Sequence, residues 1–167
     1  VLGEIIFDAK NGSIISSEAL QNPYDPRLSI SESFIKIPYL SNTITDQHYT
    51  QRERHGRHLA FMARMITDSE IDARGIGVDE RTAVCIDQAG NASIYGLNKA
   101  YFLINQGKAP ENCIPNTPLN WVQNQEAVRA YIFQASTTGT PAFNINEWPT
   151  DAPNQYWYSE NGVLKVK

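Results

Sequence analysis

A short polar segment, residues 46–57, has the highest density of side chains that can do chemistry. It reads DQHYTQRERHGR and lies where a predicted strand ends and a predicted helix begins. In α/β sheets this junction faces the crevice in which ligands bind. His48 is the candidate general base, because imidazole is the side chain whose ordinary pKa lies nearest neutrality. A histidine that only packs or faces solvent is the alternative that this spacing leaves open.

The same segment carries a cluster of positive charge in a chain whose formal net charge is −4. Arg52, Arg54 and Arg57 lie within six residues of one another at the start of the predicted helix. A guanidinium binds carboxylates through two parallel hydrogen bonds, so the cluster suits a substrate with an anionic group. The alternative is a solvated helix face with local partners such as Glu53 and Asp68.

A second polar segment follows a predicted strand that begins at Gly75. It reads GIGVDERTA, and its acids Asp79 and Glu80 come directly after the apolar residues. Glycines allow another part of the chain to approach the backbone closely. An acid at the end of this strand reaches His48, about thirty residues earlier, only if the fold brings the two together. The alternative is a turn with ordinary surface acids.

Metal binding is a further hypothesis, in which His48, His55 and His58 act as ligands of a hydrolytic metal ion. The neighbouring arginines oppose it, because they raise the cost of placing a divalent cation there, and no HExxH pattern is present. We therefore expect no metal and no other cofactor. The chain's two cysteines do not have the paired spacing of a zinc site, and Cys85, in an apolar run, is predicted to be a buried structural thiol.

Taken together, the two polar segments resemble motifs of the cyanophycinase family of serine peptidases. The family pattern D-Q-H-[FY]-[ST]-Q-R-x-R-x-x-R matches residues 46–57 without a break, and G-I-G-[IV]-D-E-x-T-A matches residues 75–83. The resemblance extends from Leu2 to about Leu103. It implies a three-layer α/β/α sandwich related to class I glutamine amidotransferases, with a Ser-His-Glu triad that cleaves β-aspartyl-arginine or related peptide bonds.

Carried over residue by residue, the resemblance implies roles for seven positions. His48 is the base and Glu80 is the acid of the triad. The positions that match the family's substrate pocket are Asp46, Gln47, Arg52, Arg54 and Arg57.

The family's nucleophile lies in a Gly-Thr-Ser-Ala-Gly elbow, and no Gly-x-Ser-x-Gly occurs in this chain. We expect the serine upstream of Val1 or on a companion chain, so that residues 1–167 form the C-terminal part of one hydrolase domain. An uncapped helix predicted at the first residues agrees with a chain that continues upstream. The competing hypothesis is a non-catalytic homologue that has lost the nucleophile and binds acidic peptides.

The composition narrows the classes of partner. The 167 residues suffice for one ordinary domain, and the net negative charge makes nucleic acid a poor candidate. No apolar run is long enough to cross a bilayer, so no membrane partner is expected. The expected partner is a peptide substrate with β-aspartyl or acidic groups, and the resemblance adds a possible homodimer. The compartment stays open, although the tail rich in Asn, Tyr and Trp leans towards an exported protein.

The elements that must position these residues follow from the hydrophobic pattern. Helices are predicted at the N-terminus over residues 1–9, over Tyr49 to Ile66, and over Gln123 to Gln134. Strands are predicted over Ser33 to Leu40, Thr43 to Thr45, Gly75 to Val78, Thr82 to Ile86, Ala92 to Tyr95 and Ala100 to Ile104. The sequence also predicts a long connection over residues 11–33, a hairpin turn at residues 88–91 and a loop-like tail from Thr137.

Overall fold

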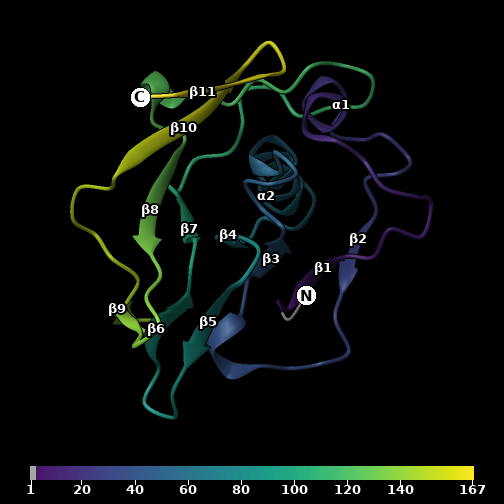
Figure 1. Ribbon diagram of the computed structural model, residues 1–167. Helices are drawn as coiled ribbons and strands as arrows, with labels where there is room; N and C mark the ends of the chain where they lie inside the picture. The colour runs from purple at the N-terminus through teal and green to yellow at the C-terminus, as the bar shows by residue number, and fades with distance from the viewer. Residues whose placement is uncertain (1–2) are drawn as a thin grey trace.

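The computed structural model describes residues 3–167 as a mixed α/β protein built on an eight-stranded sheet (Figure 1). The strand order in this sheet is β11-β10-β8-β7-β4-β3-β1-β2, and a second sheet has the order β5-β6-β9. The strands are β1 (Ile5–Phe7), β2 (Ile30–Glu32), β3 (Thr43–Gln47), β4 (Arg74–Val78), β5 (Thr82–Ile86), β6 (Asn91–Gly96), β7 (Lys99–Asn105), β8 (Val128–Gln134), β9 (Thr140–Asn144), β10 (Gln155–Glu160) and β11 (Val163–Val166). The helices are α1 (Ser16–Gln21) and α2 (His55–Ser69), with short 3-10 turns at Pro38–Leu40 and Gln123–Gln125. The α/β class expected from the sequence is thereby confirmed.

The large sheet is parallel only in its middle. β3 pairs in parallel with both β1 and β4, and the other strand pairs of this sheet are antiparallel. Because the carboxyl ends of neighbouring parallel strands meet at one edge of a sheet, the residues that follow β3 and β4 are brought together. This pairing therefore fixes the place of the two polar segments.

Two clusters of buried side chains hold the sheets and helices together, and they contact opposite faces of β4. One cluster contains Leu59 and Met62 of α2, and in Figure 1 both helices lie to one side of β8, β7 and β4. The other cluster contains Ile76 of β4 and Ile94 of β6, so it joins the large sheet to the small one. Successive residues of a strand face opposite sides of the sheet, so Ile76 lies in the second cluster, whereas Gly77 faces Tyr49 of the first.

Helix α2 starts later than predicted, at His55 rather than Tyr49. Residues 49–54 form turns, and the chain takes left-handed φ angles just before them, 51° at His48, and within them, 48° at Glu53. A helix cannot propagate through such angles, because it needs negative φ at every residue. α2 ends at Ser69, where Glu70 adopts a left-handed φ of 53°. No helix within residues 3–167 has the length and apolar character needed to span a membrane.

The predicted helix over residues 123–134 is wrong, and so is the loop-like tail. Residues 128–134 form β8, which pairs with β7 along its length and with β10 on its other side. A strand that is covered on both faces carries apolar residues at odd and even positions, and such a run resembles a helical pattern. The tail contributes β9, β10 and β11, and Trp157 on β10 is almost fully buried.

Three predictions near the N-terminus also need correction. Residues 5–7 are strand β1 rather than helix, and residues 1 and 2 of the predicted helix lie outside the described part of the chain. Residues 33–40 form no strand, because pairing with β1 ends at Glu32 and the chain then leaves the sheet. The predicted connection over residues 11–33 contains α1 and β2.

The strands predicted from Thr43 to Ile104 are present, and so is the turn at residues 88–91, which joins β5 to β6. Cys85 is exposed, contrary to the predicted buried thiol. On β5 the side chains of Val84 and Ile86 face the core, and the alternation of the strand turns Cys85 outwards.

Candidate functional site

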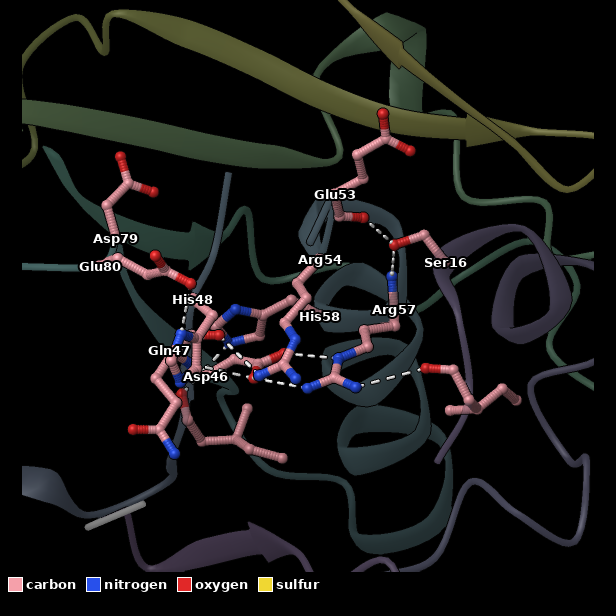
Figure 2. Close-up of polar contacts among 12 residues, drawn as sticks. Ser16, Asp46, Gln47, His48, Glu53, Arg54, Arg57, His58, Asp79 and Glu80 are labelled. Carbon is pink, nitrogen blue, oxygen red and sulfur yellow. Dashed lines mark hydrogen bonds and ion pairs between the residues drawn. The ribbon is translucent and has the colours of Figure 1, made fainter. Parts of the chain in front are cut away.

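The central feature of the candidate site is a contact between His48 and Glu80. His48 Nδ1 lies 2.8 Å from Glu80 Oε1, with the two side chains 40% and 44% exposed. His48 comes directly after β3, and Glu80 lies two residues beyond β4. The parallel pairing of these strands, in which Gln47 is the partner of Val78, brings the two residues together (Figure 2).

This contact fixes the chemistry available to the imidazole. A carboxylate accepts hydrogen bonds, so a neutral His48 donates its Nδ1 proton to Glu80 and keeps the lone pair on Nε2. In this tautomer Nε2 is the nitrogen that can remove a proton from a reacting group. Glu80 also stabilises the imidazolium that forms when the proton is taken up.

Backbone contacts hold Glu80 in place from both sides. Its N–H donates to Gln51 Oε1 at 3.0 Å, and its carbonyl accepts a hydrogen bond from Asn98 Nδ2 at 2.7 Å. Asp79, which is buried, accepts hydrogen bonds from the backbone N–H of Thr50 at 2.8 Å and of Lys99 at 3.2 Å. Asp79, the neighbour of Glu80, therefore ties the turn after His48 to the first residue of β7.

No role in the site was predicted for Gln51, Asn98 or Asp79. Asp79 had a signal, since it is an acid next to Glu80 at the end of a strand. Its partner Lys99 lies on β7, and that neighbour becomes apparent only with the antiparallel pairing of β4 and β7. For Asn98 the sequence carries no signal.

Asp46 and two of the predicted site arginines form a compact ion-pair network. Arg57 donates from Nε to Asp46 Oδ2 at 2.7 Å and from Nη2 to Asp46 Oδ1 at 2.6 Å. Arg54 Nη1 lies 3.0 Å from Asp46 Oδ1 and 2.6 Å from the carbonyl oxygen of Gln47. Asp46 and Arg57 are each 5% exposed, and Arg54 is 14% exposed. Burial lowers the pKa of Arg54, an effect that the neighbouring carboxylate of Asp46 opposes.

This arrangement differs from both sequence hypotheses about the arginines. Arg57 is enclosed and satisfied by Asp46 and by the carbonyl oxygen of Ile14, so it braces β3 against α2. Arg54 reaches the same acid from the start of α2. Arg52 is exposed, and no hydrogen bond or ion pair of its guanidinium is formed within residues 3–167. Of the three arginines, Arg52 is therefore the one whose charge is available to a ligand.

Ser16 lies at the other end of this network. Its Oγ accepts a hydrogen bond from the N–H of Arg57 at 3.1 Å and donates to the carbonyl oxygen of Glu53. Figure 2 shows Ser16 on the side of Arg57 away from His48. Its hydroxyl is thus engaged at the start of α2, and no serine among residues 3–167 hydrogen-bonds to His48.

Of the other two histidines, His58 is buried and His55 is half-buried, and both lie in an aromatic cluster with Tyr49, Tyr101 and Trp157. His58 Nε2 lies 3.2 Å from the carbonyl oxygen of Ile44, and burial lowers the pKa of His58 to about 4. Burial also lowers the pKa of His55. Within residues 3–167, no three His, Cys, Asp or Glu side chains converge in a way that could hold a metal ion.

A pocket of about 400 Å³ opens beside His48 and Glu80. It lies between β4 and β5, and its polar wall includes Asp46, Gln47 and Asp79. The pocket is large enough for a small molecule or for part of a peptide. The candidate base and acid therefore lie at the mouth of a space in which a substrate can bind.

Two comparisons with known proteins were negative. A scan against models of protein families found none that matches the chain, and a search of curated proteins found no match either.

Proposed function

We propose that this chain supplies the base and the acid of a serine-type hydrolase that cleaves β-aspartyl or related peptide bonds. The observation that carries the proposal is the 2.8 Å contact between His48 Nδ1 and Glu80 Oε1 at the mouth of the pocket. The motif resemblance to cyanophycinases adds the substrate class and the expectation of a three-layer sandwich related to class I glutamine amidotransferases. The parallel pairing of β3 and β4 is compatible with that architecture.

In the proposed reaction a serine hydroxyl outside residues 1–167 attacks the scissile carbonyl. The bond between serine Oγ and the carbonyl carbon forms while His48 Nε2 takes the hydroxyl proton. Collapse of the tetrahedral intermediate breaks the C–N bond, and His48 gives the proton to the leaving amine. Water then hydrolyses the acyl-enzyme by the same base catalysis, and Glu80 keeps the imidazole in its reactive tautomer throughout.

The exposed charge of Arg52, in the turn between His48 and α2, is the one that we expect to bind an anionic group of the substrate. Arg54, which is partly accessible, contacts the carbonyl oxygen of Gln47 and adds positive potential beside the pocket. Arg57 and Asp46 shape the site indirectly, because their mutual contacts hold the end of β3 in place. Gln47 lines the pocket and is exposed, so its amide can hydrogen-bond to a bound peptide.

The test uses the protein as its source produces it, with every chain that co-purifies. It is incubated with a fluorophosphonate probe, and the labelled species is identified by mass spectrometry under denaturing conditions. Labelling of a serine on an upstream segment or a companion chain, together with hydrolysis of a β-aspartyl dipeptide, is the expected result.

Absence of both labelling and hydrolysis would overturn the proposal. It would favour the other candidate, a non-catalytic homologue that binds acidic peptides. The observation in favour of that candidate is that no serine among residues 3–167 hydrogen-bonds to His48.

A further inference from the structure

The interior of the pocket beside His48 is apolar, in contrast to its mouth. Leu40, Ile76 and Val84 line it, and they belong to the cluster that joins the two sheets. Ile76 comes from β4 and Val84 from β5, so the pocket extends into the space between the two sheets. A side chain that enters this space leaves water for an apolar surface, which is favourable for hydrocarbon and unfavourable for a charged group.

The acidic residues around the mouth of the pocket already have partners, so they do not favour binding of a cationic side chain. Asp46 is paired with Arg54 and Arg57, Asp79 accepts two backbone N–H groups, and Glu80 is held by His48. A substrate guanidinium would have to displace a partner of Asp46 or Asp79, or enter the apolar interior unpaired, since the exposed Glu80 lies outside that interior. Both routes are costly, because an unpaired buried charge is strongly destabilising.

Arg81 supplies an unused positive charge at the rim of the same pocket. It lies between Glu80 and β5, lines the pocket and is exposed, with a left-handed φ of 57°. Within residues 3–167 its guanidinium forms no hydrogen bond or ion pair. The position is variable in the pattern G-I-G-[IV]-D-E-x-T-A, so Arg81 is a feature of this chain rather than of the motif.

We propose that this pocket binds a C-terminal aliphatic residue of the substrate, with its side chain between β4 and β5 and its α-carboxylate on Arg81. The inference rests on the proposed hydrolase function and names the leaving group that the site prefers. A pocket of about 400 Å³ has room for one such residue. The preferred substrates are therefore β-aspartyl dipeptides with leucine, isoleucine or valine as the second residue.

The experiment measures kcat/KM for three dipeptides with the complete protein: β-aspartyl-leucine, β-aspartyl-leucine amide and β-aspartyl-arginine. The leucine dipeptide is expected to exceed the other two by roughly tenfold or more, because the amide loses the charge that Arg81 binds and arginine does not suit the apolar interior. In Arg81→Gln the advantage of the free carboxylate over the amide disappears, mainly through KM. Lys108→Gln, which removes an exposed charge elsewhere, leaves the advantage unchanged.

Two substitutions at Val84 test the apolar interior. Val84→Phe narrows the pocket and lowers kcat/KM for the leucine dipeptide relative to β-aspartyl-glycine, whereas Val84→Ala widens it and raises acceptance of β-aspartyl-phenylalanine. Cys85→Ser, on the outward face of the same strand, changes neither ratio. Circular dichroism and thermal unfolding show whether each variant is folded.

The possible outcomes separate this inference from the function on which it rests. If none of the dipeptides is hydrolysed, the proposed hydrolase function fails. If they are hydrolysed but arginine is preferred, or if Arg81→Gln leaves the ratio of free acid to amide unchanged, the hydrolase survives and the aliphatic pocket is refuted.

Discussion

Two acid–base contacts lie at the ends of β3 and β4, and they differ in their exposure to solvent. His48 and Glu80 are both more than a third exposed, so their contact contributes little to the free energy of unfolding. Asp46 and Arg57 are almost completely buried and satisfy each other through two hydrogen bonds. The first pair is therefore suited to chemistry, and the second pair to keeping the first in place.

Removal of either member of the exposed pair should abolish turnover without unfolding the protein. His48→Ala and Glu80→Gln are each expected to lower kcat for a β-aspartyl dipeptide by a factor of about a thousand or more, since each removes one member of the proposed triad. The midpoint of thermal unfolding should change little. Glu147→Gln, at an exposed acid elsewhere, is the matched control and should retain full activity. Near-normal kcat in either site variant would contradict the assignment of base and acid.

The buried pair should behave in the opposite way. Asp46→Asn leaves Arg57 buried without its counter-ion and is expected to lower the free energy of unfolding by about 3 kcal/mol. Urea unfolding followed by fluorescence measures this loss. Glu160→Gln interrupts an exposed ion pair with Lys165 and should cost less than about 1 kcal/mol. Equal losses of unfolding free energy in the two variants would show that the burial of Asp46 does not determine how much its ion pairs stabilise the protein.

At the scale of elements, β4 connects the candidate site to the core through its glycines. A Cβ atom at Gly77 would lie 2.6 Å from Cε1 of Tyr49, the residue that follows His48. At Gly75 a Cβ atom would lie 2.6 Å from Nε2 of His58. The turn before α2 and α2 itself therefore pack against the backbone of β4 more closely than any residue with a Cβ atom would allow.

Gly77→Ala should therefore disturb the site as well as the core. Displacement of Tyr49 is expected to lower the free energy of unfolding by about 1 to 3 kcal/mol and to reduce kcat of the folded protein by shifting His48. Gly107→Ala serves as the control, because its Cβ would meet nothing within 4 Å and only its left-handed φ of 73° opposes the substitution. That variant should lose stability but keep its kcat. A Gly77→Ala protein with normal kcat would show that Tyr49 does not transmit the change.

The same scale shows which parts of the structure could be predicted from the sequence. The strands from Thr43 to Ile104 were predictable because each is rich in residues that favour strands and is bounded by turn residues close to it in sequence. The approach of Glu80 to His48 follows once β3 and β4 are parallel neighbours. β8 could not be distinguished from a helix, because both of its faces are buried and its apolar spacing fits either period. The pairing of Arg54 and Arg57 with Asp46 was missed because a cluster of charges in sequence does not reveal which charge is buried.

For the whole molecule, one buried histidine connects the site to global stability. His58 is completely buried on α2, beside Tyr49 and close to the charges of Asp46 and Arg57. Its Nε2 donates to the carbonyl oxygen of Ile44 on β3, whereas its Nδ1 has no hydrogen-bonding partner within residues 3–167. A protonated imidazole in this position would be desolvated, so the folded protein holds His58 neutral.

This burial makes the free energy of unfolding depend on pH. The pKa of His58 is about 4 in the folded protein against an ordinary value of 6.5. Between these values the unfolded chain binds a proton that the folded protein does not, so the contribution of His58 is fully present above pH 6.5 and falls as the pH is lowered towards 4, by at most about 3 kcal/mol. Urea unfolding at several values between about pH 4.5 and 7.5 measures the slope.

His58→Gln keeps a hydrogen-bond donor for Ile44 but does not titrate, so it should flatten the pH dependence across this range. His55, which is half-buried and whose pKa is also lowered by burial, adds a dependence of the same sign that persists in the variant. An unchanged slope in His58→Gln would mean that His58 binds its proton equally well in the folded and unfolded states. That result would require a water molecule at Nδ1 that solvates the charge, and the burial of Nδ1 among protein atoms argues against it.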